Sequence, residues 1–312
     1  MAASEILLPV TDYDLAATLD SGQVFRWRQV GDSWHGIIGR HSVRLTPSPG
    51  AIHAVTAAPV TSWDFLHEFL QARVDLPAIL KTFPADGPMN DAIAACPGLR
   101  LLRQDPWECL ASFILSSTKQ IVQIRQIVAL LCERFGEPAA GLKDYSSAHQ
   151  PAENSQLVTA QKSLPRGAAA IGAGPACCFP TAKRIAAATE AELRACKMGF
   201  RAPGLLRAAR EIAEGRLDLE KIRTLDYAHA RAELMKLHGV GGKIADCVLL
   251  FAYGFDSSFP VDVWVERALQ KLYFPRRRAS DRRLRKFAAT HFGPHAGYAQ
   301  QYLFHYMRTK VK

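Results

Sequence analysis

The stretch LHGVGGK (237–243), followed by FPVDVW (259–264), decides the fold that we expect for this chain. Gly239, Gly241 and Gly242 allow a tight turn, because glycine adopts positive φ angles and carries no Cβ. Apolar residues at helical spacing flank the turn, so the segment predicts a helix–hairpin–helix. Backbone N–H groups at the start of the second helix would bind a phosphate without reading a base sequence. An ordinary turn between two helices is the alternative for the glycines alone.

Lys243 ends the turn, and Asp262 lies nineteen residues later, at the expected start of another helix. Such a lysine either contacts phosphate or, when partly buried at a helix start, gives up its proton more readily and becomes a nucleophile. Asp262 is either a plain helix cap or a carboxylate that stabilises positive charge on a sugar. Together, the amine and the carboxylate are the groups needed to break a glycosidic bond, with the amine attacking C1′ as the base leaves.

The composition fits a protein that binds a polyanion. The chain has 312 residues, a formal net charge of +10 and a pI of about 9.4, and 48% of its residues are hydrophobic. No apolar run reaches the ~20 residues of a membrane span, and the N-terminus lacks the basic segment of a secretory signal. The seven cysteines form no C-x-x-C pair and none follows Cys247, which argues against a disulfide framework, a zinc site or an iron–sulfur cluster. We therefore expect an intracellular protein, in the cytoplasm or nucleoid of a bacterium or the nucleus of a eukaryote.

Hydrophobic periodicity divides the chain into two parts. We expect an N-terminal α+β domain at 1–98 and an all-helical domain at 99–312, so the fold class is mainly α with a smaller α+β part. Residues 22–46 alternate in the manner of strands and predict a small antiparallel sheet. Its strands are expected near 25–27, 34–38 and 43–45, and its turns at 31–33 and 39–41.

From about residue 100 onward, the spacing of apolar residues is helical. Asp105-Pro106 is a helix start, a capping side chain followed by proline at the first helical position, and Gly136 ends the helix that begins near Ile121. Residues 146–178 are rich in Ser, Ala, Gln, Gly and Pro without an apolar period, and they predict a flexible surface insertion. The other predicted helices span 181–197, 203–214, 226–237, 243–254, 263–274, 280–292 and 295–309, which puts the helix–hairpin–helix at about 226–254.

Several separated segments resemble, in the right order, the signature segments of one family of DNA repair enzymes. Apart from 146–178, nearly the whole chain is similar to the helix–hairpin–helix DNA glycosylases, and specifically to the eukaryotic-type 8-oxoguanine DNA glycosylases. The segments are SGQVFRWR (21–28), LRLLRQDPWECLASFILSS (99–117), MGFRA (198–202), HGVGGKIADC (238–247), PVDVW (260–264) and GPHAGYAQQYLF (293–304).

The resemblance implies a bifunctional enzyme acting on double-stranded DNA that contains a damaged purine. Such an enzyme flips the base out of the duplex, removes it, and then nicks the strand by β-elimination through a lysine imine. By this resemblance, Lys243 is the nucleophile and Asp262 supports the oxocarbenium-like transition state. The chemistry implied needs neither a metal nor an organic cofactor, and we expect a monomer with no membrane association.

The resemblance also implies a pocket for the flipped base. Gly22 matches the glycine whose main-chain carbonyl accepts a hydrogen bond from N7–H, which 8-oxoguanine has and guanine lacks. A buried carbonyl left without this donor costs ~1–3 kcal/mol, which disfavours guanine. Gln300 matches the residue that reads the Watson–Crick edge, and Phe304 and Cys247 match those that sandwich the base. Phe251 falls where the family often has methionine. Without the family, Gly22 would be a strand-start glycine, and Phe304 and Cys247 would be core residues.

The positions expected to contact DNA depart from the family in several places. Phe200 and Arg201 fall where the family has an aromatic wedge and an arginine, and a phenyl ring can still fill the gap left by an extruded base. Trp264 replaces a histidine that helps to hold the DNA. The departures at the positions that read the opposite base predict relaxed selectivity for that base. The positions that read the opposite cytosine in the family, an asparagine-rich tip and an arginine, are here Thr118, Lys119, Gln120 and Gln123.

Two alternatives remain open on the sequence alone. A related glycosylase for alkylated or other damaged bases often uses the aspartate and water without a lysine nucleophile. A catalytically silent helix–hairpin–helix module would use the hairpin only to bind phosphates. For an 8-oxoguanine glycosylase, we expect the active site where the two parts of the chain face each other, because Gly22 must reach the pocket of Lys243.

Overall fold

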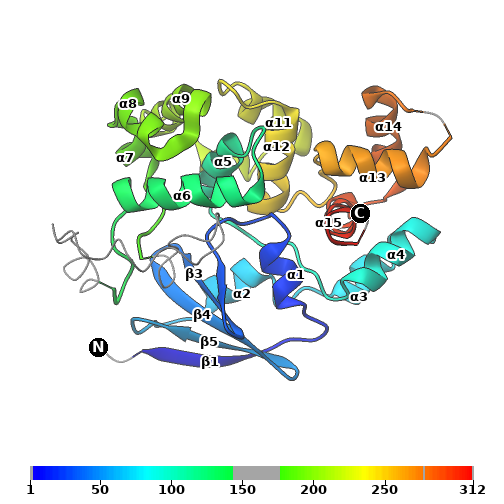
Figure 1. Ribbon diagram of the computed structural model, residues 1–312, viewed down its shortest axis with the longest axis horizontal. Coiled ribbons are helices and arrows are strands. Elements are labelled where there is room, and N and C mark those ends of the chain that lie inside the picture. Colours follow the sequence, from blue (N-terminus) through cyan, green and yellow to red (C-terminus); the bar gives the residue numbers. More distant parts are fainter. Residues whose placement is uncertain (1–2, 143–175, 277, 311–312) are drawn as a thin grey trace, which may run out of the picture.

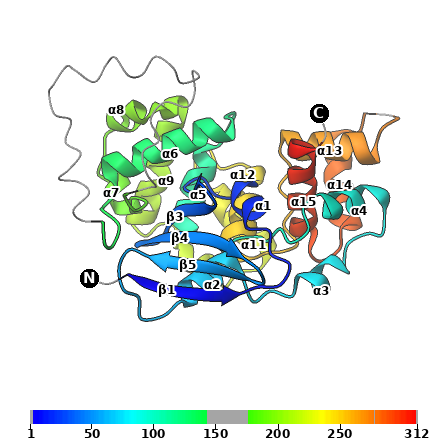
Figure 2. The ribbon, with the colours of Figure 1, turned by 60° about the horizontal axis from the view of Figure 1, so that its bottom comes forward.

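The computed structural model describes residues 3–142, 176–276 and 278–310. It consists of an antiparallel sheet and a larger group of helices that lies to one side of the sheet (Figures 1 and 2). This arrangement confirms the expected fold class. The strands are β1 (Ser4–Pro9), β2 (Arg28–Val30), β3 (Ser33–Ile38), β4 (His41–Ser48) and β5 (Ala51–Thr56), in the order β1-β5-β4-β3-β2.

The central hairpins of the sheet follow the predicted turns, but the predicted strand at 25–27 is wrong. Gly31 and Gly39 have φ angles of 59° and 56° and allow the tight connections on either side of β3. Trp27 is buried because its ring lies against the bare α-carbon of Gly36, where a Cβ would collide with it. Trp27 thus belongs to the core, and the paired residues of β2 begin only at Arg28.

β1 and β5 add two strands that the alternation of residues 22–46 did not predict. They pair from Ser4 opposite Thr56 to Pro9 opposite Ala51. β1 is an edge strand on which only Leu8 is buried, so its sequence carries little of the alternating pattern. The strands share a core with α1 (Leu15–Asp20) and α2 (Asp64–Leu70), which Figure 1 shows on the inner side of the sheet.

The helical part begins with α5 (Pro106–Leu115), as predicted. The carboxylate of Asp105 accepts a hydrogen bond from the N–H of Glu108 at 2.8 Å and so caps this helix. α6 (Ile121–Phe135) ends at Gly136, which is also as predicted. The remaining elements are α7 (Ala182–Ala186), α8 (Glu190–Leu193), η2 (Arg194–Met198), η3 (Gly199–Arg201), α9 (Ala202–Ala213), α10 (Leu219–Ile222), α11 (Tyr227–Met235), α12 (Gly242–Val248), η4 (Leu249–Tyr253), α13 (Val263–Tyr273), α14 (Asp281–His291) and α15 (Ala296–Thr309).

The single helix predicted over 181–197 is wrong, because the chain is capped and kinked there. α8 starts at Thr189, whose hydroxyl accepts a hydrogen bond from the N–H of Glu192 at 3.2 Å. Lys197 adopts a left-handed conformation (φ 61°), which ends the helical run. The 3₁₀ turn that follows carries Phe200 at the surface.

Two helices that precede residue 98 pack with the helical part of the chain. α4 (Gly87–Ala95) contacts α15, and Met89 is fully buried in the same core as Tyr302. α3 (Leu76–Leu80) contributes to this core as well, and Figure 2 shows α3 and α4 on the side of α15. α3 and α4 therefore belong to the core of the helical part, although they precede residue 98 in the sequence.

The insertion expected at 146–178 lies mostly outside the described residues, which resume at Ala176. Its last residues pair with the segment that follows α6. The N–H of Ala139 donates to the carbonyl of Ala176 at 2.9 Å, and the N–H of Cys178 donates to that of Glu137 at 2.7 Å. These two hydrogen bonds hold residues 176–178 against the segment after α6, just before α7 begins.

No group of three or more His, Cys, Asp or Glu side chains in the described ranges could hold a metal ion. None of the helices in them is both long and apolar enough to cross a membrane.

Candidate active site

The hairpin between α11 and α12 owes its shape to its glycines. Gly239 has a φ of +84°, which L side chains rarely adopt, and Gly241 precedes α12 as its N-cap. A Cβ on Gly242 would collide with the guanidinium of Arg231. That guanidinium forms an ion pair of 2.7 Å with the buried carboxylate of Asp246, which ties α11 to α12. The hairpin therefore exposes bare backbone at the end where α12 begins.

Lys243 lies in the first turn of α12 and is partly buried. Its amine nitrogen lies 3.5 Å from the hydroxyl oxygen of Ser116, at the end of α5. The same nitrogen lies 5.1 Å from the ring centroid of Phe113, within range of a cation–π interaction. These contacts place the amine between α12 and α5.

Asp262 caps α13 and also interacts with Lys243. One carboxylate oxygen accepts a hydrogen bond from the N–H of Val265 at 2.8 Å. Burial raises the pKa of the Asp262 carboxyl above its ordinary value, while this hydrogen bond and the charge of Lys243 oppose part of the rise. The carboxylate is therefore both a helix cap and an anion close to the amine, so the two interpretations of Asp262 do not exclude each other.

Lys243 and Asp262 line the same cavity of about 370 Å³, a volume within the roughly 300–1,000 Å³ of small-molecule sites. The cavity lies between the N-terminal part and the helical part, since both contribute to its wall. Its lining consists of Ser21, Gly22, Phe25, Phe113, Ser116, Lys119, Gln120, Ile121, Ile124, Lys243, Cys247, Phe251, Pro260, Asp262, Trp264, Gln300, Gln301, Phe304 and Arg308.

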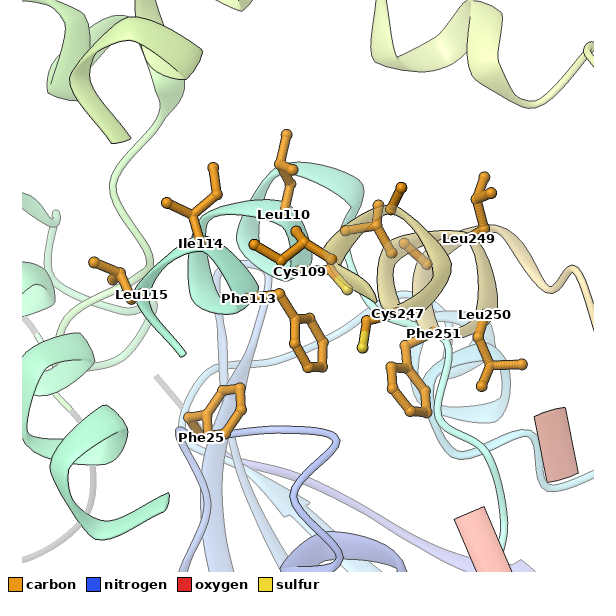
Figure 3. Close-up of a cluster of buried hydrophobic side chains, with 14 of the residues drawn as sticks. Phe25, Cys109, Leu110, Phe113, Ile114, Leu115, Cys247, Leu249, Leu250 and Phe251 are labelled. Atoms are coloured by element: carbon orange, nitrogen blue, oxygen red, sulfur yellow. The ribbon is translucent and has the colours of Figure 1, made fainter. Parts of the chain in front are cut away.

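One wall of the cavity is aromatic and apolar. Figure 3 shows Phe113, Cys247 and Phe251 projecting from the same side of α5 and of the α12–η4 helix, toward Phe25. The rings of Phe113 and Phe251 are stacked at 5.6 Å between centroids. Burial raises the pKa of the Cys247 thiol to about 12, against the opposing charge of Lys243, so the thiol is neutral at physiological pH. Such a wall suits the flat face of a nucleobase.

Gln300 and Phe304 lie one helical turn apart on α15 and both face the cavity. Gln300 is buried, and its amide oxygen has no hydrogen-bond partner among the residues that the structure describes. A buried acceptor without a partner is costly, which indicates that a ligand meets it. Gly22 (φ +80°) lies opposite Phe304: an added Cβ would lie 3.3 Å from its ring and 3.0 Å from Cδ1 of Ile121.

The predicted opposite-base residues lie at the α5–α6 turn, and several are engaged within it. Thr118 has a φ of 56°, an unfavourable angle for a β-branched residue. The buried guanidinium of Arg201 donates to the carbonyl of Ser117 at 2.8 Å and to the hydroxyl of Thr118 at 2.7 Å. The side chain of Gln123 accepts a hydrogen bond from the N–H of Gln120 at 3.2 Å and caps α6. Of the predicted opposite-base residues, Lys119 and Gln120 line the cavity, whereas Thr118 and Gln123 do not.

Phe200 and Trp264 are the exposed aromatic residues near these elements. Phe200 is 65% exposed, and the guanidinium carbon of Arg201 lies 4.2 Å from its ring centroid. Trp264, in the first turn of α13, lines the cavity beside Asp262, and the guanidinium carbon of Arg267 lies 5.3 Å from its ring. Trp264 is therefore at the edge of the cavity, whereas Phe200 is not part of its lining.

Several lining residues were missed by sequence reasoning. Phe25, Phe113 and Ser116 all fall inside the quoted family segments, but nothing distinguishes them from ordinary core residues. Arg308 lies four residues after Phe304, so the helical spacing that joins Gln300 to Phe304 would also have found Arg308. Gln301 is another missed lining residue, and its side-chain amide donates a hydrogen bond to the carbonyl of Ser21 at 2.9 Å.

Comparison with known proteins gives matches along almost the whole chain. Residues 5–110 match the family model of the 8-oxoguanine DNA glycosylase N-terminal domain, and residues 111–292 match that of the HhH-GPD superfamily of base excision DNA repair proteins. The chain is 29% identical to a Methanothermobacter thermautotrophicus protein named "Probable N-glycosylase/DNA lyase", over 96% of this chain and 95% of that protein. It is 28% identical to the N-glycosylase/DNA lyase OGG1 of Arabidopsis thaliana, over 94% of this chain and 77% of that protein.

Solved structures agree with the sequence matches. The 8-oxoguanine glycosylase/lyase of Clostridium acetobutylicum, in complex with double-stranded DNA containing cytosine opposite 8-oxoG, has a TM-score of 0.80 and 27% identity, with 97% of each chain covered. MBOgg1, in complex with a low-affinity DNA ligand, has a TM-score of 0.83 and 28% identity, with 100% of each chain covered. The family resemblance is confirmed: this chain belongs to the HhH-GPD superfamily of base excision DNA repair proteins and carries the N-terminal domain of the 8-oxoguanine DNA glycosylases.

Proposed function

We propose that this chain is a bifunctional DNA glycosylase and AP lyase that excises 8-oxoguanine from double-stranded DNA. The observation that carries the proposal is that an amine and a carboxylate, Lys243 and Asp262, line one cavity with a buried amide that lacks a partner among the described residues. The cavity is large enough for a flipped base, and the relatives named above include glycosylase/lyases of this class. We expect it to act as a monomer, inside the cell where its DNA substrate is.

The proposed reaction uses the two charged residues in different ways. As the bond between C1′ and the base lengthens, positive charge grows on the sugar, and the carboxylate of Asp262 stabilises it. The amine lone pair of Lys243 forms a bond to C1′, and the electrons of the broken bond leave with the base, which takes up a proton. The C1′–O4′ bond of this amine adduct then breaks, with O4′ taking up a proton and the nitrogen giving one up, and an imine results. The imine acidifies the 2′ position, and loss of a 2′ proton expels the 3′ phosphate by β-elimination. The glycine hairpin holds the DNA backbone meanwhile.

The proposed base pocket reads the lesion with one carbonyl and one amide. The main-chain carbonyl of Gly22 accepts the N7–H of 8-oxoguanine, and guanine places a lone pair there instead. The amide of Gln300 meets the Watson–Crick edge, while Phe304 and Cys247 cover the two faces of the base. Phe251 lies beside Cys247 in the wall and keeps it apolar.

Gln300→Leu is expected to slow excision of 8-oxoguanine by about ten- to a hundredfold, because the edge-reading amide is lost. The same change removes a buried acceptor that has no partner in the described part of the chain, so the melting temperature is expected to stay equal or rise. Single-turnover excision and thermal melting measure the two effects. Wild-type excision together with a lower melting temperature would show that Gln300 is only a core residue.

Relaxed selectivity for the opposite base is also part of the proposal. Two of the residues at the positions that read the opposite cytosine in the family, Thr118 and Gln123, are engaged in hydrogen bonds at the α5–α6 turn. Each good hydrogen-bonded contact to a base contributes roughly 1–3 kcal/mol of discrimination between bases. Without such contacts, little preference for cytosine over the other opposite bases remains. We expect excision from lesion:C, lesion:A, lesion:G and lesion:T duplexes at rates within about tenfold of each other. A strong preference for cytosine in single-turnover assays contradicts this expectation.

A panel of lesion duplexes with borohydride trapping tests the whole proposal. Borohydride reduces the imine, so a covalent protein–DNA adduct on 8-oxoguanine duplexes, with release of the base, is the expected result. Release of an alkylated purine without an adduct would favour a glycosylase that uses water. Binding of every duplex with neither base release nor an adduct would favour a silent DNA-binding module.

A further inference from the structure

Asp20 joins three elements next to the base pocket. It is the last residue of α1, and its carboxylate accepts a charged hydrogen bond of 2.6 Å from Arg125 on α6. The guanidinium of Arg308 on α15 lies 3.3 Å from the other carboxylate oxygen and also donates to the main-chain carbonyl of Asp20. α1, α6 and α15 are thus fixed to one another at a single residue. We call Asp20, Arg125 and Arg308 the Asp20 triad.

The Asp20 triad adjoins both recognition groups of the proposed pocket. Ser21 and Gly22 follow Asp20 directly, and Ser21 is fully buried. On the other side, the guanidinium carbon of Arg308 lies 5.8 Å from the ring centroid of Phe304, and Arg308 itself lines the cavity. Gly22 and Phe304 face each other so closely that a single added carbon would contact the ring. The triad therefore determines the spacing between them.

The two arginines need the carboxylate between them. The side chain of Arg308 is 19% exposed and that of Arg125 is 29% exposed, so neither is freely solvated. Burial lowers the pKa of Arg308, Asp20 opposes this shift, and the positive charge of Arg125 adds to it. Without the negative charge of Asp20, two partly buried cations of the same sign would face each other and separate.

We propose that Asp20 is a positioning residue for lesion recognition, which holds the Gly22 carbonyl and Phe304 at the spacing that an 8-oxoguanine base requires. This inference rests on the proposed function. Among the described residues, the triad forms no hydrogen bond or ion pair with Lys243, Asp262 or the glycine hairpin. Loss of Asp20 should therefore impair removal of the base, and not cleavage at a site that has already lost its base.

Asp20→Asn separates these two steps, because asparagine keeps the shape of the residue and removes only its charge. We expect single-turnover excision of 8-oxoguanine to fall by about tenfold or more, as the recognition groups shift apart. Cleavage of a duplex with a preformed abasic site should stay close to the wild-type rate. Asp64→Asn is the matched control and should change neither rate, because Asp64 lies on α2 and its exposed carboxylate pairs with Arg73, at 3.6 Å, outside the cavity. Arg308→Lys keeps a positive charge and should lose less excision activity than Asp20→Asn.

Unchanged excision in Asp20→Asn, or an equal loss of excision and abasic-site cleavage, overturns the inference, since the first shows no role and the second shows general disruption. Thermal melting and abasic-site cleavage of the variant show whether it is folded. Failure of the wild-type chain to excise 8-oxoguanine would instead overturn the proposed function itself.

Discussion

Lys243→Gln is expected to abolish the borohydride-trapped adduct and to lower abasic-site cleavage at least about a thousandfold, because no other amine takes part in the proposed chemistry. Lys243 is the only lysine besides Lys119 that lines the cavity of the described structure, and it alone interacts with Asp262. Glutamine keeps the length of most of the side chain and can still accept and donate hydrogen bonds near Ser116. Folding should therefore be retained, and binding of a lesion duplex should remain measurable.

Lys236→Gln is a matched control for the loss of one positive charge near the hairpin. Lys236 follows α11 and forms an exposed ion pair of 2.6 Å with Glu233, so its replacement should leave the adduct intact. An adduct of wild-type yield in Lys243→Gln would show that another amine attacks C1′, and Lys119 would then be the next residue to test.

Asp262→Asn is expected to lower the rate of 8-oxoguanine excision by about a hundred- to a thousandfold, the usual cost of losing one electrostatic contact to a transition state. Asparagine retains the oxygen that caps α13, so the hydrogen bond to Val265 is kept. Because burial raises the pKa of the Asp262 carboxyl in the folded protein, ionising it lowers the free energy of unfolding. This cost is fully present above the folded-state pKa and absent below the unfolded-state pKa. The variant should therefore melt at the same temperature as the wild type or higher at neutral pH.

The raised pKa of Asp262 also predicts the pH dependence of the wild-type enzyme. The reactive carboxylate must be ionised, so excision should decline on acidification at a higher pH than an exposed aspartate would give. Asp226→Asn is a suitable control for Asp262→Asn, since Asp226 caps α11 in the same way at 3.0 Å but is exposed and does not line the cavity. Loss of stability without loss of rate in Asp262→Asn would reduce Asp262 to a plain cap.

Local signals in the sequence determined much of this protein. The Asp105-Pro106 start, the Gly136 stop and the glycine hairpin depend on interactions between residues a few positions apart, so each is visible in a short window. Family motifs added the residues of the candidate site, because their order and spacing are specific even where each single residue has an ordinary alternative. Their roles, above all those of Gly22 and Gln300, stay predictions until the variants are measured.

Only the tertiary structure decided how distant segments meet. The pairing of β1 with β5, the packing of α4 against α15 and the Asp20 triad join residues that are from about fifty to almost three hundred positions apart, and no local pattern encodes such contacts. The sequence does not encode the direction of a side chain either: the guanidinium of Arg201, a predicted DNA-contacting residue, donates to the carbonyl of Ser117 and the hydroxyl of Thr118 in the α5–α6 turn. The sequence supplies the chemical groups, whereas long-range packing sets which of them face one another.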